Sequence, residues 1–124
     1  MSGINYTDKI PNNVNLSGDR ALQLFARLLG DTCRSGDLIA RMGGEEFAVL
    51  MLHNTAQAGA AFDRRLRHRL HDASAAELGF VLDYSAGMAA LIPGESSLAA
   101  LMARADAALY DAKTAGRGCL MAAS

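Results

Sequence analysis

The sequence predicts one domain of the α/β or α+β class, and three observations support this. Segments with apolar residues at helical spacing alternate with short apolar runs of strand length. In chain order they give a helix, a hairpin, a helix, one or two strands, a helix and a strand, which does not fix the strand order. The 124 residues are 51% hydrophobic, which is enough to bury one core, so we expect a single domain over residues 1–124.

The N-terminal segment, residues 1–16, is rich in asparagine and typical of loop, with a short strand near Ile4–Thr7. A helix is then expected over residues 19–34, because apolar side chains recur on one face. Ser17 is its expected N-cap, and the acid Asp19 suits the positive end of the helix dipole.

Two apolar runs, Leu38–Met42 and Phe47–Leu52, flank Gly43-Gly44 and predict a β-hairpin, since its tight turn needs positive φ. The second run lacks alternation, which indicates burial on both faces of a sheet. The glycines leave backbone N–H groups open to a phosphate, and Glu45 and Glu46 follow directly. Such a turn suits a metal–nucleotide site, although a solvated turn without that role has the same pattern.

A second helix is expected over about 55–73, with apolar residues one turn apart. Its other face carries four arginines: Arg64, Arg65, Arg67 and Arg69. Nucleic-acid binding is disfavoured, because no aromatic residue is interleaved and the net charge of the chain is −1. A solvated helix face is the simpler interpretation.

Residues 78–91 predict one strand or a strand pair, with Gly87 at a bulge or a close packing contact. Pro93-Gly94 then turns the chain, and residues 118–121 are expected to form a closing strand.

Between that turn and the closing strand, an apolar stripe predicts a last helix, capped by Ser96 or Ser97 and stopped by Gly116. Lys113 lies in its final turn and Arg117 just beyond. Two cations at this end also suit the helix dipole, whatever else they do.

Composition excludes several classes of protein. No apolar run approaches the length of a membrane-spanning helix, and the first residues lack a basic leader with an apolar core. Cys33 and Cys119 lack metal-ligand spacing and are expected to be buried thiols. We therefore expect a cytoplasmic protein without a membrane segment.

Three motifs in this sequence resemble those of GGDEF domains, the diguanylate cyclase family. Arg41–Phe47 (Arg-Met-Gly-Gly-Glu-Glu-Phe) is similar to the family signature in its Glu-Glu variant. Arg34–Asp37 (Arg-Ser-Gly-Asp) is similar to the product-inhibition motif, and Ala105–Arg117 to the C-terminal helix pattern. The likeness implies a mostly antiparallel central sheet flanked by helices, akin to nucleotide-cyclase and polymerase-palm folds.

The resemblance implies an enzyme that condenses two GTP molecules into cyclic di-GMP, with one GTP held by each protomer of a homodimer. Glu45 and Glu46 would be the catalytic carboxylates and the ligands of Mg²⁺ (or Mn²⁺). Cyclic di-GMP itself would bind an inhibitory site of Arg34, Asp37 and Arg65, or Arg64 in its place. The implied contacts to GTP come from Asp19, Gly43, Gly44, Lys113 and Arg117.

The N-terminal segment departs from the family pattern, which has an opening helix and a central first strand with a metal-binding aspartate. An ungapped alignment places Ser2 at that aspartate and Ile10 at a guanine-binding asparagine, whereas a gapped one places Asn12 or Asn13 at the latter. This segment therefore replaces or truncates the usual first strand. The centre of the sheet is filled by residues 3–8, by a partner chain, or not at all.

This departure leaves a second functional hypothesis. The alternative to an active cyclase is a catalytically impaired domain that serves as a cyclic di-GMP receptor or a dimerisation module. A truncated piece of a longer cyclase is a third, weaker interpretation.

Overall fold

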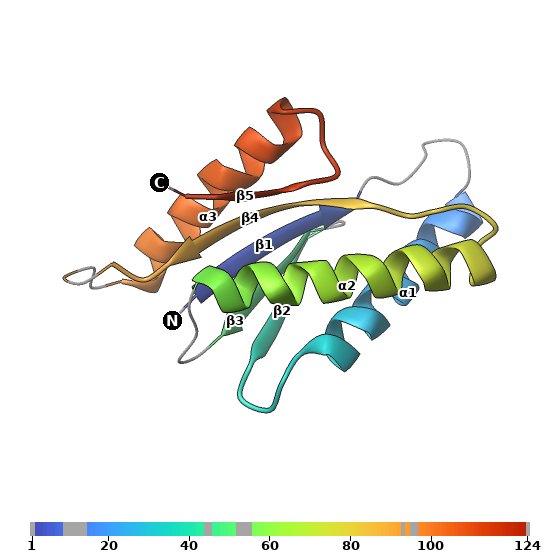
Figure 1. The fold of residues 1–124 in the computed structure, drawn as a ribbon, viewed down its shortest axis with the longest axis horizontal. Helices are drawn as coiled ribbons and strands as arrows, with labels where there is room; N and C mark the ends of the chain where they lie inside the picture. Colours follow the sequence, from blue (N-terminus) through green and yellow to red (C-terminus); the bar gives the residue numbers. More distant parts are fainter. Residues whose placement is uncertain are drawn as a thin grey trace.

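A computed structural model describes residues 2–8, 15–43, 46–51, 56–92, 94 and 97–123. The elements in chain order are β1 (Ser2–Asp8), α1 (Asn15–Thr32), β2 (Leu38–Gly43), β3 (Glu46–Met51), α2 (Ala56–Glu77), β4 (Tyr84–Ala90), α3 (Leu98–Thr114) and β5 (Leu120–Ala122) (Figure 1).

The strands form one five-stranded sheet in the order β2-β3-β1-β4-β5. All neighbouring strands are antiparallel except β4 and β5, which are parallel and joined through α3. The predicted class, a mostly antiparallel central sheet flanked by helices, is therefore confirmed.

The N-terminal segment supplies the strand at the centre of the sheet. In β1, Ile4 pairs with Val49 of β3 on one side and with Met88 of β4 on the other. Of the three alternatives for the sheet centre, the one in which residues 3–8 fill it is correct. The strand is also longer than the predicted Ile4–Thr7.

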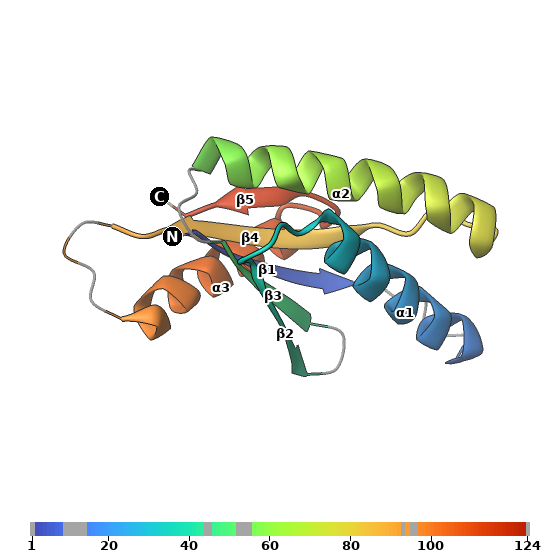
Figure 2. The same ribbon diagram turned by 90° about the horizontal axis from the view of Figure 1, so that it is seen from below.

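Helices cover the two faces of the sheet unequally. Figure 2 shows α1 and α2 on one face and α3 on the other. The larger core lies under α1 and α2, where Phe25 packs against the rings of Phe47 and Tyr84 at centroid distances of 5.3 and 5.2 Å. A smaller cluster lies under α3 and contains Ala89, Leu101 and Ala105. As predicted, β3 is buried along most of its length.

Several element boundaries differ from the predictions: the first helix ends at Thr32 rather than at residue 34, and the closing strand is Leu120–Ala122 rather than residues 118–121. The first helix begins at Asn15, so Ser17 lies inside it and the N-cap prediction was wrong. Serine favours the cap position but is tolerated in the first turn of a helix, so residue type alone does not fix where the helix begins. The second helix continues to Glu77, because the alanines after residue 72 are strong helix formers.

Residues 78–91 form one strand rather than two. After α2, Gly79 has a φ of +80°, and the amide of Leu82 donates to the Ser74 hydroxyl at 2.8 Å. Residues 78–83 are therefore a connection, which the hydrogen bond between Leu82 and Ser74 holds against the end of α2. Only Tyr84–Ala90 enters the sheet.

The ends of α3 agree with the prediction. The Ser97 side chain accepts from the amide of Ala100, so Ser97 is the N-cap. At the other end Gly116 has a φ of +116°, and the amide of Arg117 donates back to the carbonyl of Ala112 at 3.0 Å. This αL glycine and the returning hydrogen bond are what ends the helix.

Gly87 marks the predicted close packing contact. The register of β4 runs through it without a shift, pairing it with Asn5 and Met121, so it is not a bulge. A Cβ added there would lie 2.1 Å from the amide nitrogen of Leu109 and 2.2 Å from the carbonyl oxygen of Ala105. Only a glycine lets α3 approach β4 this closely.

Candidate functional site

The end of α3 meets the hairpin at an ion pair. Lys113 Nζ lies 3.8 Å from Glu46 Oε1, with both side chains partly exposed. The structure thus brings together a carboxylate of the hairpin and a cation from the far end of the sequence. Gly43 ends β2 and pairs with Glu46, whereas Gly44 and Glu45 lie outside the described residues.

Arg117 lies in the loop that follows α3 and is exposed. Its φ is +66°, the only positive value of a non-glycine residue among those that the structure describes. Asp19 lies in the second turn of α1, but its side chain is outside the described part. The structure therefore places Arg117 beyond the helix end that carries Lys113, and does not test a contact for Asp19.

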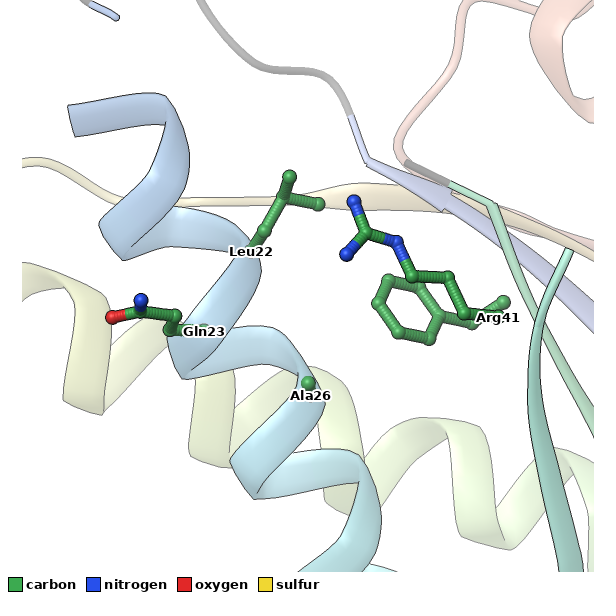
Figure 3. Close-up of a pocket in the computed structure, with 5 residues that line it drawn as sticks. Leu22, Gln23, Ala26 and Arg41 are labelled. Carbon is green, nitrogen blue, oxygen red and sulfur yellow. The ribbon is translucent and has the colours of Figure 1, made fainter. Parts of the chain in front are cut away.

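A cavity of about 240 Å³ lies between α1 and the hairpin. Figure 3 shows Leu22, Gln23 and Ala26 on α1, with Leu22 and Ala26 on the side toward Arg41 of β2. The remaining wall is the ring of Phe47, with the guanidinium carbon of Arg41 5.9 Å from its centroid. Apolar walls with one amide and one guanidinium suit a flat polar ring system.

Sequence reasoning did not single out these lining residues. Leu22 and Ala26 belong to the predicted first helix and Arg41 to the signature motif, and none of them was predicted to line a site. Because Glu46 and Phe47 are consecutive in a strand, their side chains point to opposite faces of the sheet. The cavity and the Lys113–Glu46 pair therefore lie on the two sides of one hairpin end.

A second concave site lies at the opposite end of the hairpin. Arg34, Asp37 and Arg65 line it together with Met51, Ala58 and Phe62. The amide of Arg34 donates to Asp37 Oδ2 at 2.8 Å, and the amide of Asp37 to the carbonyl of Arg34 at 3.0 Å. Arg64, the alternative in the sequence-based prediction, does not line this site. Arg41 and Asp37 are four residues apart along the chain, as are Phe47 and Met51, so the two sites lie about 13 Å apart along the hairpin.

Both cysteines are free and only half-buried, so they are less buried than predicted. Partial burial, together with the charge of Asp37, raises the pKa of the Cys33 thiol to about 11. Cys33 therefore stays protonated at neutral pH, which argues against a nucleophilic role.

Arg67 is not part of a solvated helix face, as had been predicted, but lies in a largely buried cluster. Its guanidinium pairs with Asp63 at 3.2 Å and with Asp83 at 2.6 Å, and lies 4.0 Å from the ring centroid of Tyr84. The hydroxyl of Tyr84 donates to Asp63 Oδ1 at 2.7 Å. Burial raises the pKa of Asp63, although Arg67 and the Tyr84 hydroxyl oppose this. The i, i+4 spacing of Asp63 and Arg67 was the available signal.

The described side chains include no group of three histidine, cysteine or acidic residues placed to hold a metal ion. At the hairpin end, the carboxylate of Glu46 is a hard oxygen donor. Among the residues that the structure describes, no helix combines the length and hydrophobicity needed to cross a bilayer.

Comparison with known proteins gives a consistent result. The family model for the GGDEF domain, described as diguanylate cyclase, matches residues 15–119. Diguanylate cyclase DgcP of Pseudomonas aeruginosa is 40% identical over 105 residues, which cover 83% of this chain and 16% of that protein. Diguanylate cyclase VdcA of Vibrio cholerae is 32% identical over 115 residues, which cover 89% of this chain and 34% of that protein. The chain thus spans a minor part of these relatives.

Solved structures agree on the fold. The GGDEF domain of DgcB from Caulobacter crescentus, solved in complex with c-di-GMP, has a TM-score of 0.85 and 28% identity, covering 98% of this chain and 77% of that one. The active GGEEF domain of a diguanylate cyclase from Vibrio cholerae also has a TM-score of 0.85, at 24% identity and covering 99% and 82%, and supports the fold alone. Since the family model spans most of the sequence, this chain belongs to the GGDEF domain family of diguanylate cyclases.

Proposed function

We propose that this chain is a diguanylate cyclase domain that condenses two GTP molecules into cyclic di-GMP. The observation that carries the proposal is the 3.8 Å approach of Lys113 to Glu46. It joins the cation of the C-terminal motif to the signature hairpin, as a site for a charged triphosphate requires. If Lys113 lay on the opposite side of the molecule from the hairpin end, the structure would argue against this function.

The nucleotide then lies across the hairpin end. Its guanine occupies the cavity lined by Leu22, Gln23 and Arg41, with Asp19 at the start of the same helix. The phosphates pass over the Gly43-Gly44 backbone to the other face of the sheet. There they meet Lys113, and Arg117 from the loop beyond it. The opposite orientations of the Glu46 and Phe47 side chains support this path.

The chemistry asks the protein mainly for positioning and charge neutralisation. The ribose 3′-oxygen of each GTP attacks the α-phosphorus of the other, so that two bonds to pyrophosphate break and two pyrophosphates leave. Each hydroxyl proton passes to a base or to water. Because each protomer holds one GTP, two chains meet head to head as a homodimer. A divalent cation such as Mg²⁺, held by Glu45 and Glu46, would activate the attacking oxygen and stabilise the leaving pyrophosphate.

The direct test is incubation of the chain with GTP and Mg²⁺, with cyclic di-GMP measured by chromatography. We expect cyclic di-GMP to form, and we expect chelation of the metal to abolish its formation. Lys113→Met should raise the KM for GTP about tenfold, since one charge-assisted contact to the phosphates is lost. Arg104→Met is the matched control, because it removes one positive charge from the same helix nine residues earlier, where the guanidinium binds the carbonyl of Ala90. Equal KM values for both variants would contradict the assignment of Lys113.

The same family context supports a cyclic di-GMP site at the other end of the hairpin. Arg34, Asp37 and Arg65 surround one concavity, and guanidinium groups fork onto phosphates or guanine edges. Occupation of this site locks protomers in an unproductive arrangement and inhibits the cyclase. A chain that binds there without turnover would instead be a receptor.

Calorimetry with cyclic di-GMP tests this second site. Arg34→Ala and Arg65→Ala should each weaken binding about tenfold, since each removes a charge-assisted contact. Arg64→Ala, a neighbouring exposed arginine outside the concavity, should bind as the unsubstituted chain does. Unchanged affinity in Arg34→Ala would rule out this site.

A further inference from the structure

The loop after α3 has an unusual backbone that needs external support. Gly116, Arg117 and Gly118 have consecutive positive φ values of +116°, +66° and +64°. A non-glycine residue in this region is disfavoured by its Cβ and persists only where surrounding contacts fix it. The contacts around this loop therefore decide where Arg117 lies.

The main contact from the sheet is Ser85 of β4. Its Oγ accepts a hydrogen bond from the amide of Gly118 at 3.1 Å, and Ser85 is only 3% exposed. Next to it, the amide of Ala86 donates to the carbonyl of Cys119 at 2.9 Å, where β5 begins. Two hydrogen bonds thus hold the loop. The amide of Arg117 donates to the carbonyl of Ala112 in α3, and the amide of Gly118 donates to the buried hydroxyl of Ser85 in β4.

Asp83 forms a second wall of the loop. A Cβ on Gly118 would come 3.0 Å from Asp83 Oδ2, so the carboxylate lies directly against the backbone. The Arg67 guanidinium holds Asp83 at 2.6 Å, and the amide of Tyr84 donates to the same oxygen at 2.9 Å. Asp83 is therefore itself fixed, and it shares the positive charge of Arg67 with Asp63.

The sheet register relates Ser85 to the hairpin end. Thr7 of β1 pairs with Ser85 on one side and with Glu46 on the other, so the three residues form one row across the sheet. With two strand spacings between them, Ser85 and Glu46 are about 10 Å apart. The Ser85 hydroxyl thus anchors the loop on the same row of the sheet as Glu46, the residue that pairs with Lys113.

We propose that Ser85 is a positioning residue for the triphosphate: through the amide of Gly118 it sets the place of Arg117 beside the Lys113–Glu46 pair. This inference rests on the proposed function, since it assumes that Arg117 contacts the phosphates of GTP. Ser85 itself touches no substrate.

The test measures the affinity for α,β-methylene GTP, which cannot release pyrophosphate, by calorimetry with Mg²⁺. Ser85→Ala should weaken binding about fivefold, the equivalent of one hydrogen bond. Ser85→Thr keeps the hydroxyl and should restore the affinity. Ser74→Ala is the matched control, because Ser74 is also a fully buried serine whose hydroxyl accepts a backbone amide, that of Leu82 at 2.8 Å.

Two further readouts separate positioning from general stability. In an Arg117→Met background, Ser85→Ala should cause no additional loss of affinity, since the two residues act as a unit. The amide of Gly118 should exchange with solvent faster in Ser85→Ala than in Ser74→Ala.

Equal losses of affinity in Ser85→Ala and Ser74→Ala, or additive losses with Arg117→Met, would overturn the proposal. A chain that takes up no GTP analogue at all would overturn the proposed function, and with it the triphosphate role of Ser85. In that case faster exchange at Gly118 would still establish Ser85 as the anchor of the loop, and unchanged exchange would refute even that.

Discussion

Replacing Gly87 with alanine is expected to destabilise the domain by about 4 kcal/mol or more, which is a large part of the stability of a domain this size. The added methyl group would collide with backbone atoms of α3 at Leu109 and Ala105, at 2.1 and 2.2 Å. Backbone in the middle of a helix cannot move aside as a side chain can. The helix must therefore shift away from β4, and Leu101 and Ala105 lose their packing.

Urea denaturation of Gly87→Ala measures this effect, and Gly30→Ala is its matched control. Gly30 lies in α1, is exposed, and would place its Cβ in open space. That variant should gain about 0.5–1 kcal/mol, because alanine is the better helix former. A Gly87→Ala protein of unchanged stability would mean that α3 does not approach β4 as described.

The second large effect is expected for Arg67→Met, with a loss of about 3–5 kcal/mol. Methionine fills a similar volume but leaves the nearly fully buried Asp63 without its ion-pair partner. Asp83 loses the same partner, but it is partly exposed and water can compensate. The destabilisation should therefore come mainly from Asp63, and urea denaturation at pH 7 measures it.

The pH dependence of this loss identifies its cause. Burial already raises the pKa of Asp63, and without Arg67 that pKa rises further. An acid whose folded-state pKa lies above its unfolded value favours folding fully below the unfolded pKa, near 4, and this contribution is lost as the pH rises through the folded pKa. The difference between Arg67→Met and the unsubstituted chain should thus grow from pH 4 to pH 7. In the double variant Asp63→Asn/Arg67→Met, the loss of stability should not change between pH 4 and pH 7. An equal loss at both pH values in Arg67→Met alone would refute this account.

The fold was largely predictable because its signals are local. The apolar stripes of the helices and the two strands of the hairpin arise from residues close in sequence, and the structure has those elements, although Gly43 ends β2 and pairs with Glu46. The end of α3 at Gly116 was predictable for the same reason, since an αL glycine acts on its own helix. What the local pattern could not supply was strand order.

The strand at the centre illustrates this gap. Residues 2–8 contain asparagine, glycine and threonine, and their sequence favours loop as much as strand. Their pairing with β3 and β4 on both sides makes them a strand, and neither partner is near in sequence. Tertiary context here overrides local propensity.

The candidate site shows a similar division. Motif residues such as Arg34 and Asp37 were predictable, because their spacing is short and their contacts are local. The role of Arg67 was not, because two of its partners lie outside α2: Asp83 just before β4, and Tyr84 at its first residue. A row of four arginines gives no indication of which one turns inward. Whether an arginine is buried depends on the groups that other parts of the chain place against it, and the sequence of one helix does not specify them.

The position of β1 also has a consequence for the order of assembly. Its first residue, Ser2, pairs with Met51 and with Ala90, so both neighbours are made long after it. During synthesis β1 leaves the ribosome with two unpaired edges, and it cannot be fully paired on both until residue 90 has emerged. Such distant pairings slow folding, and a nascent chain of this kind is expected to need protection from other exposed strands before its own partners arrive.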